Sequence, residues 1–387
     1  MRSLKLTVKT FYGLEGVLKD ELEELGFKDV EILNRAVQLK GTWKDVYYLN
    51  VHLRCAISVL VELKAFKIRK ERDLYEQCYN YPWEELFDVT KTFAVKGAVH
   101  SDIFRHSQYP FLLVKDAVVD RFRDQTGNRP DVNVKTPQIL LDLYANNDQM
   151  VLSFNTSGAP LFQRGYRDST GDAPLNEVVA AGLIRLSGWD KKSDLIDPFC
   201  GSGTIAIEAA LLAVGIPSNI ERRHYAFKNL KSFSNEDFEK IFDEIDRRVT
   251  ALPCEIYASD ISAEMVTKTR RNLRALPVGR FVKTEVCSFE EVRKKGNEGT
   301  IITNPPYGER MGEDIEELYA AIGSWLKHEM TGYQCWIISS NMEAMKQIGL
   351  KPDSKTKVFN GKLECTYRSY SVFEGKRAEE LQKKAEN

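Results

Sequence analysis

The sequence predicts a two-part α/β protein, in which an α+β region precedes a domain built on a mostly parallel sheet. Three observations predict the second part. A short apolar strand at 193–197 runs into a glycine-rich turn that opens a helix, as in the ligand-binding turns of doubly wound sheets. A second strand at 299–303 stops at the consecutive prolines of an Asn-Pro-Pro-Tyr segment. An Asn-Gly pair at 360–361 separates two strand-like runs and predicts an antiparallel closing hairpin.

The chain has 387 residues, which exceeds a typical single domain and favours two or three domains. No apolar run is long enough to cross a bilayer, and the first residues alternate like a strand instead of forming a signal peptide. The seven cysteines are scattered, without a C-x-x-C pair or a nearby histidine at metal spacing, so we expect reduced thiols, no metal and a cytoplasmic location. The net charge of −1 excludes a global basic field, so a nucleic acid would have to be bound by local patches.

The first 66 residues alternate between strand-like and helix-like patterns. Helical spacing of apolar residues is clearest at 13–25 and ends at Gly26. The predicted order is strand 4–8, helix 13–25, hairpin 30–39, helix 43–51 and strand 56–66. This βαββαβ order predicts a small ferredoxin-like α+β subdomain at residues 1–66.

Residues 67–160 predict a second α+β unit. A basic run at 64–72 is either solvated linker charge or an RNA-phosphate contact, and turn formers at 155–160 predict a hinge before the last domain, residues 161–387. The pattern is helix 74–86, strand 92–99, helix 111–126 and strands 132–144 and 149–155. Basic residues recur on the second of these helices and the strand that follows, at Lys115, Arg121, Arg123, Arg129 and Lys135.

The glycine-rich turn at 197–204 reads Asp-Pro-Phe-Cys-Gly-Ser-Gly-Thr. Gly201 and Gly203 let the backbone approach a ligand closely, and the N–H groups that start the next helix face the turn. A phosphate-binding loop would need Lys and Ser/Thr after Gly203, and a dinucleotide turn would need a third glycine where Ile205 and Ala206 stand. The turn therefore predicts a site for another nucleotide-like ligand, with an ordinary strand-to-helix turn as the alternative.

The Asn-Pro-Pro-Tyr segment at 304–307 suits an amino group attached to a heteroaromatic ring. Because the two prolines hold the chain extended at the carboxyl edge of the sheet, the segment lies where such sheets bind ligands. Asn304 Oδ1 and the carbonyl of Pro305 can accept hydrogen bonds from the amine, while Tyr307 stacks on the base. The alternative is a rigid turn with an exposed tyrosine.

The two segments resemble motifs I and IV of S-adenosylmethionine-dependent methyltransferases that act on adenine N6, guanine N2 and glutamine amides. Together with Gln-Arg-Gly-Tyr-Arg at 163–167 and Ala-Pro-Leu-Asn-Glu at 173–177, their order resembles the THUMP-containing guanine-N2 methyltransferases of bacterial ribosomal RNA, often labelled as adenine-N6 DNA methylases. This resemblance implies a Rossmann-like class I methyltransferase sheet with an antiparallel closing hairpin. It also implies that the preceding α+β region is ferredoxin-like at 1–66 and an RNA-binding THUMP domain at 67–160.

The resemblance further implies roles for single residues of the two motifs. The catalytic loop would consist of Asn304, Pro305, Pro306 and Tyr307. The cofactor S-adenosylmethionine would be bound by the turn residues Asp197, Pro198, Cys200, Gly201, Ser202, Gly203 and Thr204.

Three further family motifs have counterparts here. Asn176 and Glu177 would lie beside the methionyl end of the cofactor, with helix capping as the alternative. Asp260 would accept hydrogen bonds from the ribose hydroxyls, and Ile261 would cover the adenine. Where the family often has an acid for the adenine amino group, this chain offers Ser288 or its backbone.

An amphipathic stretch at 222–252 fills the long spacing before Asp260, and we expect an insertion that caps the sheet.

The predicted RNA contacts of this half lie around the proposed site. The predicted RNA contacts are Arg164, Tyr166, Arg167, Arg310 and Lys362. For Arg310, an ion pair within the protein is the alternative.

These expectations converge on a cytoplasmic methyltransferase that makes N2-methylguanosine in 23S ribosomal RNA. Its expected partners are S-adenosylmethionine and ribosomal RNA, without a metal or a membrane, and a monomer is one of the oligomeric states that the sequence allows. Three alternatives stay open: guanine N2 in transfer RNA, adenine N6 in DNA, and an RNA-binding protein with a vestigial catalytic half. The sequence leaves the modified nucleotide and the oligomeric state open.

Overall fold

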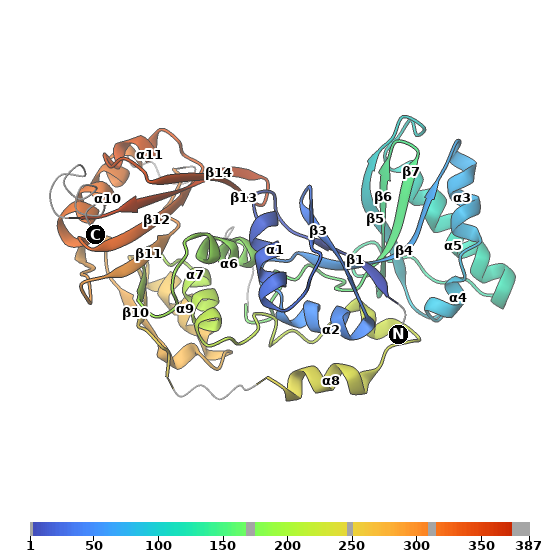
Figure 1. Ribbon diagram of the computed structural model, residues 1–387, viewed down its shortest axis with the longest axis horizontal. Helices are drawn as coiled ribbons and strands as arrows, with labels where there is room; N and C mark the ends of the chain where they lie inside the picture. The colour runs from blue at the N-terminus through green and yellow to red at the C-terminus, as the bar shows by residue number, and fades with distance from the viewer. Residues whose placement is uncertain (1–2, 168–174, 246–250, 309–314, 374–387) are drawn as a thin grey trace. The chain divides into compact units, whose positions relative to one another are not determined.

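The structure is a computed structural model that describes residues 3–167, 175–245, 251–308 and 315–373. The chain divides into two compact units (Figure 1). In the described ranges, none of the helices has the length and apolar character that crossing a membrane requires. The first unit comprises Met1–Thr10, Glu21–Gln163 and Arg222–Ile245, and the second comprises Phe11–Asp20, Arg164–Glu221 and Asp246–Asn387.

The first unit is built on one continuous sheet, which has seven strands within its described residues in the order β2-β3-β1-β4-β7-β6-β5 (Figure 1). Strand β4 pairs antiparallel with β1 on one side and with β7 on the other. The two segments predicted as separate subdomains therefore share a sheet, and β4 belongs to both. The strands are β1 (Leu4–Lys9), β2 (Glu31–Leu33), β3 (Ala36–Gly41), β4 (Ser58–Lys67), β5 (Phe93–His100), β6 (Ile139–Asn146) and β7 (Gln149–Asn155).

Two elements of this unit differ from their predicted bounds by more than two residues. The helix predicted at 74–86 is split into α3 (Glu71–Tyr79) and α4 (Trp83–Leu86), because Pro82 interrupts it. The strand predicted from 132 begins at Ile139. Before it, Asn133 Oδ1 accepts hydrogen bonds from the backbone N–H groups two and three residues later, at 3.1 and 3.0 Å, and the turn so formed breaks the strand.

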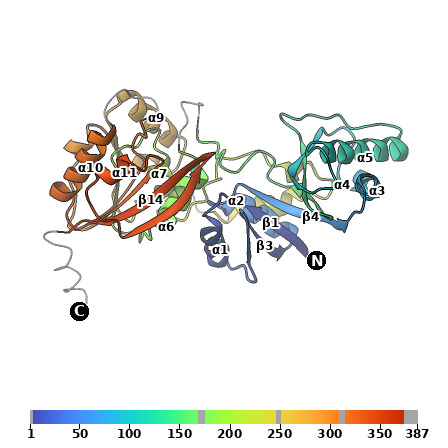
Figure 2. The same cartoon turned by 90° about the horizontal axis from the view of Figure 1, so that it is seen from above.

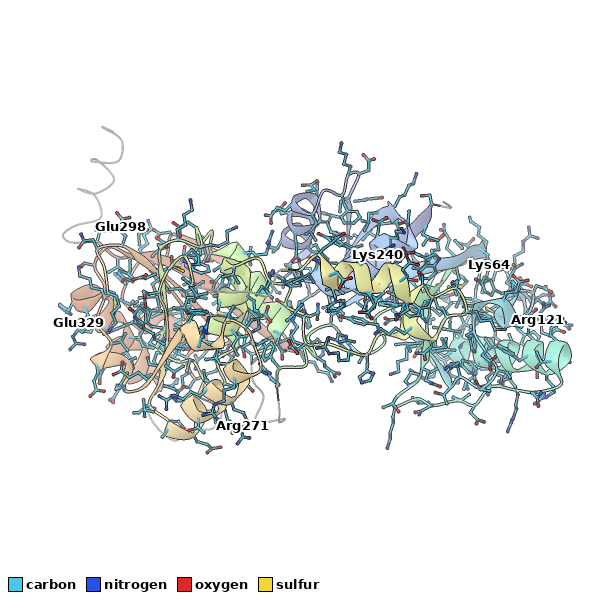
Figure 3. The ribbon with its side chains drawn as sticks, turned by 90° about the horizontal axis from the view of Figure 1, so that it is seen from below. Lys64, Arg121, Lys240, Arg271, Glu298 and Glu329 are labelled. Atoms are coloured by element: carbon cyan, nitrogen blue, oxygen red, sulfur yellow. The ribbon has the colours of Figure 1, made fainter. Side chains whose placement is uncertain are left out.

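The stretch at 222–245 does not cap the sheet of the second unit, contrary to the prediction. It belongs to the first unit, where α8 (Asn235–Asp243) packs against α2 (Trp43–His52). The ring of Tyr47 on α2 lies 4.8 Å from Phe227 and 5.6 Å from Phe233, measured between ring centroids. The apolar side of the insertion therefore covers α2, while Lys240 lies on its exposed side (Figure 3). The other helices of this unit are α5 (Tyr109–Thr126) and the 3-10 helix η1 (Ala226–Asn229), while α1 (Glu15–Glu24) is divided between the units.

The segment predicted as a hinge, 155–160, is tightly held, and its first three residues are buried. Thr156 and Ser157 have no exposed surface. The guanidinium of Arg222 donates hydrogen bonds to the carbonyls of Ser157, Ala159 and Pro160 at 3.0, 2.6 and 2.7 Å. Because one side chain satisfies three carbonyls of this segment, the segment is a fixed part of the first unit.

The second unit has the predicted Rossmann-like fold, which confirms the fold class. Among its described residues the sheet has seven strands in the order β10-β9-β8-β11-β12-β14-β13, with helices such as α9 and α10 beside it (Figure 2). The strands from β10 to β12 are parallel, and β14 and β13 form the antiparallel closing hairpin at Asn360-Gly361. The strands are β8 (Asp194–Asp197), β9 (Ile256–Asp260), β10 (Val282–Val286), β11 (Gly299–Thr303), β12 (Tyr333–Ser339), β13 (Ser354–Asn360) and β14 (Leu363–Ser371).

Apolar residues on both faces of this sheet form the core of the second unit. Ile301, Ile337 and Tyr319 are buried in one cluster on the side of α10. This packing fixes the strand ends from which the candidate site is built. The helices are α6 (Glu177–Leu186), α7 (Thr204–Ala213), α9 (Ala263–Arg274), α10 (Ile315–Glu329) and α11 (Ala344–Gln347), with 3-10 helices η2 (Gly279–Phe281) and η3 (Phe289–Glu291).

Candidate functional site

Three neighbouring parallel strands place the predicted motifs at one edge of the second sheet. Strand β8 lies between β9 and β11, and it is parallel to both. The register pairs Ile196 with Ile301, so the turn after Asp197 and the loop after Thr303 leave the sheet side by side. Asp260 ends β9 at the same edge. This carboxyl edge is where open α/β sheets bind ligands.

The glycine turn has the open backbone that a close ligand requires. Gly201 and Gly203 both have left-handed backbones, with φ of 52° and 82°. A Cβ on Gly201 would meet nothing within 4 Å, whereas a Cβ on Gly203 would lie 2.6 Å from the Thr269 methyl group. Gly201 therefore keeps the ligand side of the turn open, while Gly203 allows α9 to pack behind it.

Helix α9 supports the turn from behind. Thr269 Oγ1 donates a hydrogen bond to the carbonyl of Gly201 at 2.8 Å, and Asn272 Nδ2 donates to the carbonyl of Ser202 at 2.9 Å. Cys200 is buried, and its backbone N–H donates to the carbonyl of Ser259 on β9 at 2.9 Å. The sequence reasoning missed Thr269 and Asn272. Their spacing of three residues on the helix after Asp260 was the signal that could have identified them.

Asp197 is almost completely buried, with 1% of its surface exposed. Its Oδ1 accepts hydrogen bonds from Thr303 Oγ1 at 2.8 Å and from the backbone N–H of Phe199 at 3.3 Å. Burial raises the pKa of Asp197 to about 7, and the nearby Asp260 carboxylate raises it further, against the effect of the two hydrogen bonds. A cation placed beside this carboxyl group would favour its ionised form.

Asp260 links the end of β9 to the glycine turn. Its Oδ2 accepts a hydrogen bond from the Gly201 N–H at 2.9 Å, and its Oδ1 accepts one from the Ser262 N–H at 2.9 Å. Each carboxylate oxygen keeps a further lone pair for a ligand hydroxyl. Ile261 follows with 77% of its surface exposed, which leaves an apolar side chain free to cover a ring.

Ser288 lies just beyond β10 and begins the 3-10 helix η3. Its hydroxyl accepts a hydrogen bond from the Glu290 N–H at 3.4 Å, and its own N–H donates to the Glu291 carboxylate at 3.1 Å. This reciprocal pair is a capping box. The structure gives Ser288 a capping role, and its predicted contact with adenine stays a prediction.

The loop at 304–307 is held in an extended form directly after β11. Tyr319 Oη, on α10, donates a hydrogen bond to the Pro306 carbonyl at 3.2 Å, and Asn341 Nδ2 donates to the Tyr307 carbonyl at 3.1 Å. Pro305 is buried, while Asn304 and Tyr307 are partly exposed. The loop thus presents an amide and an aromatic ring from a backbone that two other elements fix.

Tyr307 and Asn304 contact each other within this loop. The Tyr307 hydroxyl donates a hydrogen bond to Asn304 Oδ1 at 2.5 Å. Burial raises the pKa of Tyr307, with the Cys365 thiol beside it as a smaller cause, so the hydroxyl stays protonated and can only act as a donor in this pair. The predicted amine acceptor therefore already has one partner in this structure.

Asn176 and Glu177 start helix α6, as the capping alternative predicted. Asn176 Oδ1 accepts hydrogen bonds from the N–H groups of Val178 and Val179 at 2.9 and 3.4 Å, and it is the N-cap. Glu177 is buried and forms an ion pair with Arg167 at 3.2 Å. Burial raises the pKa of Glu177, with Arg167 opposing that rise.

Three residues predicted to contact RNA have other partners in this structure. Arg164 is 1% exposed and forms a buried ion pair with Glu208 at 3.2 Å, where a phosphate cannot reach it. Tyr166 is also buried, with its hydroxyl 3.4 Å from the same carboxylate. Arg167 donates hydrogen bonds to Thr204 Oγ1 and to the Leu175 carbonyl in addition to its ion pair. We therefore correct the assignments of Arg164 and Tyr166 to roles in the fold, where both contact Glu208 on α7. Arg167 joins the starts of α6 and α7, and its predicted contact with RNA stays a prediction.

The remaining predicted RNA contacts differ in their setting. Lys362 is exposed on the turn between β13 and β14, whose Asn360 Oδ1 accepts a hydrogen bond from the Asn176 N–H at 3.3 Å. The turn therefore lies beside the start of α6. Arg310 lies outside the described residues.

Some basic residues of the first unit form contacts with other residues of the protein. Arg121 on α5 forms an ion pair with Glu84, and its Nε lies 3.1 Å from the carboxylate (Figure 3). Lys64 Nζ donates to the Gln77 carbonyl at 3.0 Å. In the described part of the chain, no cluster of three or more His, Cys, Asp or Glu residues could hold a metal ion.

Comparisons with known proteins agree with this geometry. The family model described as the RMKL-like methyltransferase domain matches residues 164–369, and models of an RlmL ferredoxin-like domain and a THUMP domain match residues 5–60 and 69–155. The Ribosomal RNA large subunit methyltransferase K/L of Psychromonas ingrahamii is 35% identical over 95% of this chain and 50% of its own length. The chain thus spans about half the length of the curated relatives it matches.

Two solved structures resemble nearly the whole chain. SMU.472, provisionally assigned as a methyltransferase and crystallised with S-adenosylhomocysteine, has a TM-score of 0.83 at 25% identity and covers 97% of this chain and 100% of its own. A predicted N6-adenine-specific DNA methylase from Listeria monocytogenes has a TM-score of 0.84 at 25% identity and covers 96% and 97%.

The fold is that of S-adenosylmethionine-dependent methyltransferases. The open glycine turn, the Asp260 carboxylate and the exposed Ile261 side chain fit the backbone, ribose and adenine contacts that this cofactor needs. The chain belongs to the RMKL-like methyltransferase-domain family, which confirms the family that the sequence motifs suggested.

Proposed function

We propose that this chain methylates the exocyclic N2 amine of a guanosine in 23S ribosomal RNA. The observation that carries the proposal is the loop at 304–307 beside the glycine turn, joined through the Thr303–Asp197 hydrogen bond. RNA as the substrate is supported by the THUMP match and by the relatives named as methyltransferases of large-subunit ribosomal RNA. Because those relatives are about twice as long, their activity is carried over only as part of this proposal.

The glycine turn and the two acidic strand ends would hold the cofactor. Bound there, S-adenosylmethionine supplies an electrophilic methyl group on a sulfonium centre. Asp260 would accept hydrogen bonds from the ribose hydroxyls, and Ile261 would cover the adenine. Asp197 would lie nearest the charged methionyl end, with Gly201 allowing the close approach.

The loop at 304–307 would orient the target amine. Asn304 Oδ1 and the Pro305 carbonyl would accept hydrogen bonds from the amine and direct its nitrogen toward the methyl group. Asn304 Oδ1 accepts a hydrogen bond from the Tyr307 hydroxyl in this structure and has a second lone pair for the amine. The guanine must leave its stack to reach the Tyr307 ring. Proton loss can follow the attack, so the loop needs no carboxylate base.

A second candidate has the same chemistry on another base. The Listeria monocytogenes structure named as an N6-adenine-specific DNA methylase supports adenine N6, because the two acceptors of the loop would serve that amine equally well. Guanine N2 in transfer RNA would use the loop in the same way. The preceding THUMP match favours RNA over DNA.

Mass spectrometry of digested nucleosides separates these candidates. The full-length chain and S-adenosylmethionine would be incubated in parallel with unmodified 23S ribosomal RNA, transfer RNA and duplex DNA, with Asn304→Ala as the inactive control. We expect N2-methylguanosine in the 23S sample alone. N6-methyladenine in DNA, or methylguanosine only in transfer RNA, would replace the proposal. RNA binding without any methylated nucleoside would indicate a vestigial site.

We also propose that the enzyme works in the cytoplasm as a monomer and without a metal. Ribosomal RNA as the substrate and the helix lengths in the described ranges support the location. Light scattering of the purified chain tests the monomer, and unchanged methylation in the presence of a chelator tests metal independence.

A further inference from the structure

Thr303 joins the two loops of the site from a position inside the sheet. It is the last residue of β11, and the next residue is Asn304. Its hydroxyl donates the 2.8 Å hydrogen bond to Asp197 Oδ1 described above. Both residues are 1% exposed, so water cannot replace either partner in this contact.

The sheet fixes the Thr303 side chain. β11 pairs with β8 up to Ile301 and with β12 up to Thr303 itself, which faces Ile337 there. A residue held in a central strand cannot move without disturbing its neighbours. The sheet therefore holds the hydroxyl in the position from which it donates to the Asp197 carboxylate.

We propose that Thr303 is a positioning residue: it holds the Asp197 carboxylate in place for the cofactor and sets Asn304 in register with it. This inference rests on the proposed function, in which the turn after Asp197 binds S-adenosylmethionine. Neither the motif at 197–204 nor the one at 304–307 includes this residue. It couples the cofactor side of the site to the substrate side through a single hydrogen bond.

The charges around Asp197 show why this hydrogen bond matters. Burial raises the pKa of Asp197 to about 7, and Asp260 at the end of β9 raises it as well. The groups that oppose them are the Thr303 hydroxyl from β11 and the Phe199 N–H from the turn, while Cys200 beside them is a buried thiol whose own pKa is raised. Removing the hydroxyl would raise the Asp197 pKa further. More of the carboxyl group would then be neutral at pH 7.

The test is the pH dependence of S-adenosylmethionine binding, measured by calorimetry on the full chain. Thr303→Val keeps the shape and removes the donor, and Thr303→Ser restores it. We expect Thr303→Val to weaken binding about tenfold at pH 7, since a hydrogen bond to a charged group is lost. The loss should shrink toward pH 9, where Asp197 is ionised in both proteins. Thr303→Ser should bind within about twofold of the wild type.

Two controls separate positioning from a general effect on folding. Thr300→Val makes the same change at the other end of β11, and it should leave binding and the melting temperature as in the wild type. In an Asp197→Asn background, Thr303→Val should add a much smaller loss, because the hydroxyl then donates to an uncharged amide oxygen. If Thr303→Val does not fold, Thr303→Ala in the same two backgrounds gives the same comparison.

The outcomes distinguish the inference from the function on which it rests. Wild-type protein that binds no S-adenosylmethionine would overturn the proposed function. If the wild type binds S-adenosylmethionine and Thr303→Val has the same affinity and pH profile, the positioning role alone would be overturned. An equal loss at every pH, not rescued by Thr303→Ser, would also overturn it.

Discussion

The Tyr307 hydroxyl donates a hydrogen bond to Asn304 Oδ1, at the position where the substrate amine is proposed to bind. Tyr319 and Asn341 fix the backbone of this loop and so hold the two residues close together. The hydroxyl occupies one of the two acceptor positions of the amide oxygen.

Replacing Tyr307 tests the two roles of this side chain. Tyr307→Phe keeps the ring for stacking and removes the donor, so we expect turnover within about threefold of the wild type, and an equal or lower KM for RNA. Tyr307→Ala loses the stacking partner and should lower kcat/KM about 10–100-fold. Steady-state methylation of a ribosomal RNA fragment measures both. A Phe variant as inactive as the Ala variant would mean that the hydroxyl itself takes part in the reaction.

Replacing Asn304 should separate catalysis from cofactor binding. Asn304→Ala removes the acceptor for the amine, and we expect methyl transfer to fall by at least about 100-fold. Its affinity for S-adenosylmethionine should stay nearly unchanged, because the side chain faces the substrate. Single-turnover rates and calorimetry check these two statements. A parallel loss of both would place Asn304 at the cofactor instead.

The two glycines of the turn should respond differently to the same substitution. Gly203→Ala would place a Cβ 2.6 Å from the Thr269 methyl group in a left-handed backbone, and it should cost about 3 kcal/mol of the free energy of unfolding. Gly201→Ala has open space around its Cβ and should cost about 1 kcal/mol, yet weaken S-adenosylmethionine binding because the methyl group points to the ligand side. Urea unfolding and calorimetry measure the two effects. Equal stability losses would contradict the packing described for α9.

Asp197 should make the stability of the protein depend on pH. Its folded pKa is raised to about 7 from an ordinary value of 3.8, so the folded state binds more protons than the unfolded state between these values. Stability contributed by the protonated form is complete below the unfolded pKa and is lost as the pH rises to about 7. The shift corresponds to about 4 kcal/mol at most. Asp197→Asn removes this dependence.

Unfolding of Asp197→Asn and of the wild type at pH 5, 6 and 8 checks that sign. The variant should gain stability relative to the wild type from pH 5 to pH 8, with most of the change below pH 7. A constant difference across this range would mean that Asp197 titrates normally in the folded protein.

Local motifs were enough to predict where the glycine turn, Asp260 and the loop at 304–307 lie, because each is a short run of adjacent residues at a strand end. The parallel order of the strands brings them to one edge, and their binding roles stay predictions. Thr303 was not recognised, since a buried threonine is also an ordinary strand residue. Only the register of β8 and β11 shows that its hydroxyl meets Asp197.

Contacts distant in sequence account for the errors. Arg164 was assigned to RNA because it is basic and lies beside a motif, but its carboxylate partner Glu208 is 44 residues away. The amphipathic pattern of the insertion at 222–245 predicts one apolar face, but it does not identify the surface that this face covers. Its partner Tyr47 lies in the first unit, on α2.

The location of that insertion limits where the chain can be divided into fragments that fold. A fragment that begins at residue 161 would carry Phe227, Phe233 and Phe238 without the Tyr47 surface that shields them, and it should be poorly soluble. A fragment that begins at residue 67 would lack β4 and leave β7 as a bare edge open to aggregation. The two units therefore alternate along the sequence, so an exchange of the N-terminal region between homologous proteins would have to include residues 222–245.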